Sequence, residues 1–160
     1  MKLYLLRHGI AANRLTWLGD DAERPLTGIG RRRTKQVAMA VKHWKLSFDR
    51  VLTSPALRAR QTAAIFTEQL GIRKKLEIDT RLAHGFNIDA LRKIASGSGA
   101  GDSLLFVGHE PEFSQVAAAL IGGGRIVVKK SGFVRIDLTA FPALRGELVW
   151  LVAPKLLRGA

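Results

Sequence analysis

Hydrophobic residues recur along the chain at two different spacings, which predicts strands that alternate with helices. Residues 3–6, Leu-Tyr-Leu-Leu, form a short continuous apolar run, as in a strand that is buried on both faces. Further along, apolar side chains recur every three or four residues, the spacing of one helix face: Val37, Ala40, Val41 and Trp44. We expect this amphipathic helix to begin near Gly28.

A second strand and a second helix are predicted by the residues that bound the next segment. Residues 50–53 have strand character, and Ser54-Pro55 has the composition of a helix N-cap followed by a first helical position. We expect the helix that starts there to end at Gly71, because glycine commonly follows the last turn of a helix.

The remainder of the chain repeats the same order of elements. We expect an extended piece at 76–78, a helix at 88–95, a strand at 103–107, a helix from Pro111 to the glycines at 122–124, and strands at 133–138 and 147–152. Strands that alternate with helices require crossover connections, so the predicted fold class is α/β: a three-layer sandwich with a mostly parallel central sheet flanked by helices. No internal repeat or long linker divides the sequence, and we expect a single domain, 1–160.

The composition of the chain excludes several kinds of site and partner, and it says less about the fold. The chain has no cysteine, which excludes disulfides, thiolate nucleophiles and cysteine zinc sites. No apolar run approaches the roughly 18 residues of a membrane span, and residues 3–6 lack the layout of a signal peptide, so a cytoplasmic protein without membrane contact is expected. The net charge of +13 favours an anionic partner or substrate. The basic residues are scattered and aromatic residues are not interleaved with them, so nucleic acid is not the expected partner.

Three predicted strand-to-helix junctions carry residues that are suited to chemistry. Arg7-His8-Gly9 follows the first strand, Arg58 lies in the first turn of the helix after the second strand, and His109 follows a later strand. In an open parallel α/β sheet, ligands bind at the carboxyl ends of the strands. We therefore expect the three junctions to converge on one site.

The residue types at these junctions suit phosphate chemistry. Two arginines offer permanently charged planar forks that match phosphoryl oxygens, and Gly9 is expected to let the backbone approach the ligand. One neutral imidazole could attack phosphorus while the other donates hydrogen bonds to the transferring group. Taken singly, each residue has a plainer explanation, as a turn residue, a surface arginine or half of a metal site. The conjunction favours a phosphate site, and neither a metal nor a cofactor is expected.

Taken in order, these junctions resemble the signature of a known family. The segments that carry the resemblance are Leu5-Leu6-Arg7-His8-Gly9, residues 24–30 (RPLTGIG), residues 53–63 (TSPALRARQTA) and Val107-Gly108-His109-Glu110. They are similar to those of the histidine phosphatase superfamily, which has the phosphoglycerate-mutase-like fold. The ordered set spans residues 3 to about 121, which is most of the chain.

The resemblance implies a role for each matching residue. His8 would be the nucleophile that is transiently phosphorylated, and Arg7, Arg58 and His109 would complete the phosphate pocket. Asn13 lies where many members of the family place a polar residue on the phosphate side.

The sequence departs from the family pattern at the proton donor. Many phosphomonoesterases of the superfamily carry a glutamate in a short Leu-x-Glu segment as general acid for the leaving oxygen, whereas the corresponding stretch here has His84. His84 is the first candidate for a replacement acid, with Glu110, Asp20 and Asp21 as alternatives; His84 could equally be a loop residue without a role. General acid catalysis contributes roughly 100- to 10,000-fold to the departure of an alkoxide. A phosphoramidate depends on it less, because imidazole is a much better leaving group.

Small size and the missing glutamate together resemble the SixA-type phosphohistidine phosphatases, which are small bacterial members that act on histidine phosphotransfer domains. The short stretch between His84 and His109 leaves little chain for a lid. The leading hypothesis is a metal-independent phosphatase that forms a covalent phosphohistidine intermediate and dephosphorylates phosphohistidine on a phosphotransfer protein. Two alternatives stay open: a small-molecule phosphomonoesterase, and a non-catalytic module that binds phosphate or polyanions. The sequence leaves the oligomeric state open.

Overall fold

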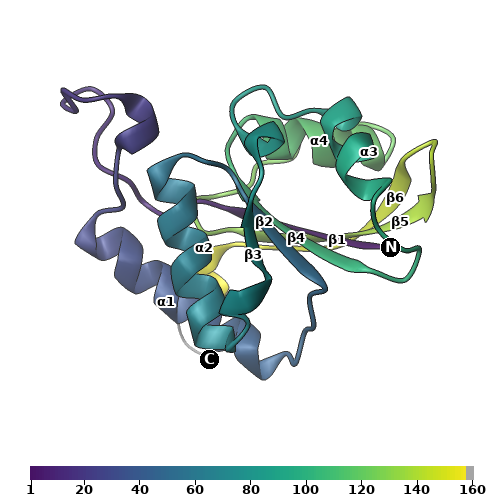
Figure 1. The fold of residues 1–160 in the computed structure, drawn as a ribbon, viewed down its shortest axis with the longest axis horizontal. Coiled ribbons are helices and arrows are strands. Elements are labelled where there is room, and N and C mark those ends of the chain that lie inside the picture. The colour runs from purple at the N-terminus through teal and green to yellow at the C-terminus, as the bar shows by residue number, and fades with distance from the viewer. Residues whose placement is uncertain (158–160) are drawn as a thin grey trace.

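The computed structural model describes residues 1–157, which contain a six-stranded sheet with helices on both faces (Figure 1). The strands are β1 (Lys2–Arg7), β2 (Arg50–Thr53), β3 (Leu76–Ile78), β4 (Ser103–Gly108), β5 (Phe133–Ala140) and β6 (Arg145–Val152). The helices are α1 (Gly28–His43), α2 (Leu57–Leu70), α3 (Ile88–Ala95) and α4 (Glu112–Leu120), with short 3-10 turns at Asp21–Glu23, Arg73–Lys75, Thr80–Leu82 and Pro154–Leu157.

The strand order is β3-β2-β4-β1-β5-β6, and the first four strands in this order run parallel. The predicted α/β class, with a mostly parallel sheet between helical layers, is confirmed. The last two strands, β5 and β6, are antiparallel and form one edge of the sheet. Only residues 141–144 connect them, which is too short for the crossover that a parallel pair requires, so they form a hairpin. Apolar spacing predicted both strands but not their direction.

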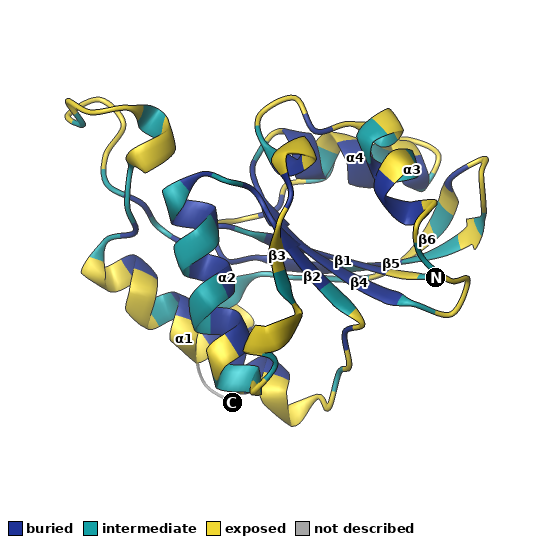
Figure 2. Cartoon of the chain, viewed as in Figure 1, coloured by how far each residue is buried: buried dark blue, intermediate teal, exposed yellow. Residues whose placement is uncertain are grey.

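The sheet separates two hydrophobic cores, and successive side chains of β1 enter them in turn. Leu3 and Leu5 pack in a cluster with residues of α3 and α4, whereas Tyr4 and Leu6 pack with residues of α1 and α2. All four side chains are buried, and Figure 2 shows the centre of the sheet buried beneath helices on both sides. This burial on both faces is what a continuous apolar run predicts for a strand.

Two helices begin later than the sequence indicated. The helix α2 starts at residue 57, so Ser54 and Pro55 precede it instead of forming its N-cap and first helical position. The Ser54 hydroxyl bonds the ring of His109 instead, and the N-cap position of α2 has no side-chain hydrogen bond. Pro111 likewise is the N-cap of α4 and lies just before its first turn.

The order of the strands brings the three predicted junctions together. The strands β1 and β4 are parallel neighbours with Arg7 opposite Gly108, and β2 pairs with β4 with Thr53 opposite Val107. The carboxyl ends of the three strands therefore lie side by side at one edge of the sheet. The expected convergence of the junctions is confirmed.

Two glycines at the start of α1 provide a matched test of how closely this helix packs on the preceding loop. A Cβ atom on Gly30 would overlap the carbonyl of Ile10, whereas one on Gly28 would meet nothing within 4 Å. We expect Gly30→Ala to lower the free energy of unfolding by about 1–3 kcal/mol, because the backbone must move to relieve the overlap. Gly28→Ala should leave it unchanged or raise it by up to about 1 kcal/mol. Urea unfolding of both variants measures the difference, and equal effects would contradict the close packing.

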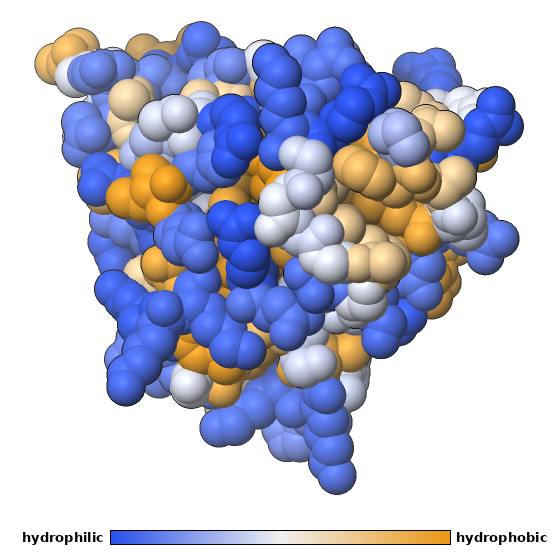
Figure 3. Space-filling model, turned by 45° about the vertical axis from the view of Figure 1, so that its right-hand side comes forward, coloured by the Kyte–Doolittle hydropathy of each residue, from blue (hydrophilic) through white to orange (hydrophobic). Residues whose placement is uncertain are grey.

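The surface carries isolated apolar side chains on a mainly hydrophilic background. Figure 3 shows one face on which hydrophilic residues predominate around several hydrophobic areas. Leu15 and Leu18 have relative exposures of 93% and 101%, and both belong to the segment that connects β1 to α1. No helix within residues 1–157 has the length and apolar character needed to cross a membrane.

Candidate active site

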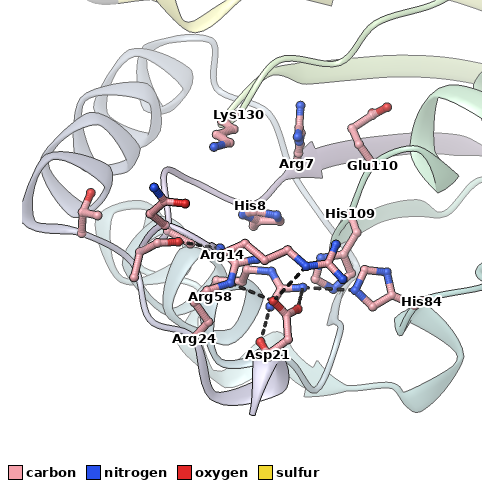
Figure 4. A pocket seen from close by; sticks show the side chains of 14 residues that line it. Arg7, His8, Arg14, Asp21, Arg24, Arg58, His84, His109, Glu110 and Lys130 are labelled. Atoms are coloured by element: carbon pink, nitrogen blue, oxygen red, sulfur yellow. Dashed lines mark hydrogen bonds and ion pairs between the residues drawn. The ribbon is translucent and has the colours of Figure 1, made fainter. Parts of the chain in front are cut away.

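A pocket of about 540 Å³ lies at the carboxyl ends of β1, β2 and β4 (Figure 4). The structure brings together in its lining all the site residues predicted from the sequence: Arg7, His8, Asn13, Arg58, His84, His109 and Glu110. Other charged residues that had not been assigned to the phosphate pocket line it as well: Arg14, Asp21, Arg24 and Lys130.

His8 is nearly buried in this pocket, and a backbone contact fixes the orientation of its ring. Its Nδ1 lies 2.7 Å from the carbonyl oxygen of Gly9. Since a carbonyl only accepts, Nδ1 carries the proton of the neutral ring and the lone pair is on Nε2. Burial, together with the nearby charges of His109, Arg58 and Arg7, lowers the pKa of His8 to about 3. The ring is therefore neutral at physiological pH, with a lone pair available on Nε2.

His109 lies beside His8, with the two ring centroids 5.2 Å apart. Its Nε2 is 2.7 Å from the hydroxyl oxygen of Ser54, which also accepts the N–H of Ala56 at 3.3 Å. The Ser54 hydroxyl can either donate to Nε2 or accept a proton from it, because a hydroxyl has one donor and two lone pairs. Burial, and next the charge of Arg58, lowers the pKa of His109 to about 4. The buried Nδ1 has no hydrogen-bond partner within residues 1–157.

Arg58, in the first turn of α2, is only 2% exposed. It donates to the backbone carbonyl of Asp21 through Nη1 at 2.6 Å, and its Nη2 pairs with the Asp21 carboxylate at 3.1 Å. The same Nη2 lies 3.2 Å from Nε2 of His84. Burial lowers the pKa of Arg58 and the Asp21 charge opposes that shift, and a guanidinium stays charged throughout the physiological range.

Arg7 and Asn13 line the pocket from the end of β1 and the loop that follows. Arg7 donates through Nη1 to the carbonyl of Val128 at 2.8 Å, while its Nε is buried without a partner within the described residues. Burial lowers the pKa of Arg7, and the charge of Glu110 partly offsets this shift. Asn13 is exposed, and its Oδ1 accepts the backbone N–H of Leu15 at 3.0 Å, so this side chain also shapes the loop.

His84 stacks on His109, with ring centroids 4.8 Å apart, and Figure 4 shows His109 between it and His8. Because a guanidinium only donates, Nε2 of His84 must accept the hydrogen bond from Arg58. The proton of the neutral His84 ring is then on Nδ1, which lies 3.3 Å from the carboxylate of Glu112. In this arrangement Nε2 of His84 has no proton of its own.

Glu110 is the pocket residue whose carboxyl group has properties suited to a general acid. It accepts a hydrogen bond from the hydroxyl of Ser114 through Oε2, and its Oε1 has no partner within residues 1–157. Burial raises the pKa of Glu110, although the Ser114 bond and the charge of Arg7 oppose the shift. A carboxyl group with a raised pKa keeps its proton to a higher pH. Of the two aspartates considered as acids, Asp21 lines the pocket and Asp20 does not.

The segment between β1 and α1 forms a wall of the pocket, and it contributes Arg14 and Arg24 in addition to the expected Asn13 and the candidate acid Asp21. In this segment Asp21 pairs with Arg24 at 2.8 Å and with Arg14 at 3.8 Å, in addition to Arg58. The hydrogen bond from Arg24, followed by the charges of the surrounding arginines, lowers the pKa of Asp21, so this group is a carboxylate. Lys130 also enters unpredicted, from the loop before β5. No regular spacing marks these positions, because they depend on the path of irregular loops.

Two further residues have roles other than those expected. Ser54, interpreted as a helix cap, is the hydrogen-bond partner of His109, and its position directly after β2 at the same sheet edge was the available signal. Gly9 was expected to let the backbone approach a ligand. A Cβ atom on Gly9 would lie 2.6 Å from Oγ1 of Thr34, so the glycine also allows close packing against α1. Its N–H donates to the hydroxyl of Thr62 at 3.0 Å.

Comparison with known proteins points to a family of phosphatases. The family model described as histidine phosphatase superfamily (branch 1) matches residues 3–85, just over half of the chain. An uncharacterized protein of Picosynechococcus sp. (strain ATCC 27264 / PCC 7002 / PR-6) is 37% identical over 166 residues, covering 98% of this chain and 99% of that protein. The phosphohistidine phosphatase SixA of Escherichia coli (strain K12) is 29% identical over 126 residues, covering 77% and 76%. A solved structure of the protein histidine phosphatase SixA complexed with tungstate has a TM-score of 0.87 at 26% identity, covering 98% and 99%.

The fold, the pocket and these similarities together define a phosphatase of the α/β class. The chain belongs to the histidine phosphatase superfamily. The resemblance expected from the ordered motifs is confirmed, including the likeness to SixA. Membership of a phosphatase family argues against the non-catalytic binding module that the net charge alone had left open.

Proposed function

We propose that the protein hydrolyses phosphohistidine on a phosphotransfer protein, through a covalent phosphohistidine intermediate on His8 and without a metal. The observation that carries this proposal is the state of His84, the residue in the place of the usual glutamate. Its Nε2 accepts a hydrogen bond from Arg58, so the pocket has a hydrogen-bond acceptor where an ester phosphatase needs an acid.

The nucleophile and its surroundings support covalent transfer. Nε2 of His8 has a free lone pair, since the proton of the ring is held on Nδ1 by the Gly9 carbonyl. Arg7 and Arg58 have the charge and geometry to bind the phosphoryl oxygens, and the ring of His109 lies beside His8 in the same pocket. Asp21 now pairs with Arg58, so phosphate has to compete with this carboxylate for the arginine.

A histidine-to-histidine transfer balances without a proton donor. The lone pair of His8 Nε2 forms a bond to phosphorus while the P–N bond of the substrate breaks, and that electron pair returns to the substrate nitrogen. The departing imidazole is neutral because its other nitrogen already holds a proton. Water then attacks the phosphorus, the bond to His8 breaks, and dihydrogen phosphate leaves while His8 regains its neutral ring. The first step exchanges one P–N bond for another. The second step replaces a P–N bond by a P–O bond, and both leaving rings keep a proton on their other nitrogen, so no acid has to replace the missing glutamate.

The mouth of the pocket supports a protein as the substrate. Asn13 and Arg14 line the pocket, and the same loop presents Leu15 and Leu18 almost fully to solvent. A protein substrate whose phosphohistidine entered the pocket would cover these two leucines. A small phosphate ester within the pocket would leave both leucines in water.

Glu110 favours a second candidate, a small-molecule phosphomonoesterase. Its carboxyl lines the pocket and burial raises its pKa, which are the properties of a general acid for an alkoxide. Against this, its Oε2 is already bonded to Ser114. The two candidates make opposite predictions for a substitution at this residue.

A substrate panel with two variants tests the proposal. The panel contains a phosphohistidine phosphotransfer protein, phosphoserine and phosphotyrosine peptides, and p-nitrophenyl phosphate. We expect kcat/KM to be at least about 100-fold higher for the phosphohistidine protein than for the esters. Glu110→Gln and His84→Gln should each lower the phosphohistidine rate less than about tenfold, below the range of general acid catalysis. Glutamine at 84 keeps an acceptor for Arg58 while removing the ring. Preference for an ester, with a loss of about 100-fold or more in Glu110→Gln, would instead establish the phosphomonoesterase.

A further inference from the structure

A second pocket, of about 610 Å³, adjoins the phosphate pocket and shares Arg7 and Lys130 with it. Residues from the end of β1, from α1, from the loop before β5 and from the segment after β6 line it. Its lining contains five cations and no acid, and we call it the basic pocket; the cations are Arg7, Arg33, Lys129, Lys130 and Lys155.

The cations of the basic pocket form no close ion pair with the described part of the chain. None of its five cations has a carboxylate within 4 Å among residues 1–157. In the phosphate pocket, by contrast, Arg24 and Arg58 both pair with Asp21. Partial burial and the charges of Arg7 and Arg24 lower the pKa of Lys130, as expected where positive groups are crowded. An anion from outside would relieve this repulsion.

The arrangement of the cations fits an extended anion better than a single phosphate. Arg33 comes from α1, Lys129 from the loop before β5 and Lys155 from the segment after β6, so their charges approach the pocket from separate elements. No aromatic side chain lines the pocket, whereas single-stranded nucleic acid is bound by stacking on aromatic rings. The lining also includes Ile10 and Pro154, which can contact the apolar part of a peptide.

The position of the basic pocket links it to the reacting histidine. Figure 4 shows Arg7 and Lys130 on one side of His8, with Arg58 and Asp21 on the other. A chain whose phosphohistidine reaches His8 can therefore continue past Arg7 and Lys130 into the basic pocket. We propose that the basic pocket binds an acidic segment of the phosphorylated protein, next to its phosphohistidine. This inference rests on the proposed function, and it makes local acidity a determinant of substrate choice.

Two peptides and two triple variants test the proposal. Both peptides contain one histidine, phosphorylated chemically with phosphoramidate; one has four flanking glutamates and the other has glutamines in their place. The test variant is Arg33→Glu with Lys129→Glu and Lys155→Glu, none of which lines the phosphate pocket. The control variant is Lys74→Glu with Lys93→Glu and Arg125→Glu, three exposed residues outside both pockets, with the same change in net charge.

We expect the natural chain and the control variant to favour the glutamate peptide by about tenfold or more in kcat/KM at low salt. This preference should shrink as salt is added and should vanish in the test variant, while hydrolysis of phosphoramidate itself stays unchanged. An equal preference in test and control variants, or none in the natural chain, would overturn the inference.

Binding of the unphosphorylated peptides, followed by fluorescence anisotropy, separates this inference from the proposed function. The glutamate peptide should bind the test variant at least about tenfold more weakly than the control variant, whether or not any phosphorylated peptide is hydrolysed. Equal binding would refute the basic pocket even if hydrolysis of both phosphorylated peptides is fast. Failure to hydrolyse either phosphorylated peptide would refute the proposed function alone. A single-stranded oligonucleotide that displaces the glutamate peptide at lower concentrations than a second glutamate peptide would assign the pocket to nucleic acid and overturn the inference.

Discussion

Replacing His8 by alanine is expected to lower kcat/KM for a phosphohistidine protein by at least about 10,000-fold. The substitution removes the only group placed to form the covalent bond to phosphorus in the proposed mechanism, while the arginines that bind the phosphoryl oxygens remain. Steady-state release of phosphate measures the loss. Brief reaction with a radiolabelled phosphohistidine protein, followed by rapid denaturation in alkali, should leave acid-labile label on the natural chain and none on His8→Ala.

A second histidine, His43, provides a matched control for the His8→Ala substitution. His43 is exposed at the end of α1, with its Nδ1 bonded to the carbonyl of Met39, and it lies outside the phosphate pocket. His43→Ala should therefore keep full activity and full labelling. Label that persists in His8→Ala, or activity within about tenfold of the natural chain, would refute covalent catalysis by His8.

The second large effect is on the pH dependence of stability. His8 has a pKa of about 3 in the folded protein, because it is buried, whereas an unfolded histidine has a pKa of about 6.5. Between these two pH values the unfolded chain binds the extra proton, so stability falls as the pH falls. The cost reaches about 2 kcal/mol at pH 5 for this residue. His109, with a pKa of about 4, adds a loss of similar size over the same interval.

Urea unfolding of His8→Asn at pH 5 and pH 7 isolates this contribution. Asparagine has no proton to gain, so the fall in unfolding free energy between the two pH values should be about 2 kcal/mol smaller than in the natural chain. A lower stability of His8→Asn at both pH values does not affect the test, because the test compares only the change in unfolding free energy between pH 5 and pH 7. An identical slope in His8→Asn would mean that His8 titrates normally in the folded protein.

The spacing of apolar residues predicted the strands and helices, because the side chains that each kind of element buries recur at a characteristic interval in the sequence. The run at 3–6 had to be a strand covered on both faces, and the helical spacing up to Trp44 gave α1 within one residue of its observed end. The direction of β5 and β6 required a different argument, from the length of their connection. The late start of α2 was missed because Ser54, a common N-cap residue, bonds a side chain that is distant in sequence.

The core of the site was predictable because its chemistry lies at the junctions between strands and helices. His8, Arg58 and His109 occupy such positions, so the strand order was enough to bring them together. Asp21 and Lys130 lie on irregular loops, where no periodicity reports which way a side chain points. The hydrogen bond from Arg58 to His84 also depends on three-dimensional placement, and it changes which proton that ring can offer.

The central place of β1 in the sheet has a consequence for how the enzyme folds. Its Lys2 pairs with Ser103 on one side and with Asp137 on the other, so both partner strands are distant in sequence. Closing loops of this length carries an entropic cost that must be met before the contacts form, and such long-range pairing slows folding. His8 directly follows this strand, so its position depends on the pairing of β1 with β4 and β5. The nucleophile therefore becomes a positioned group only after these long-range pairs have formed.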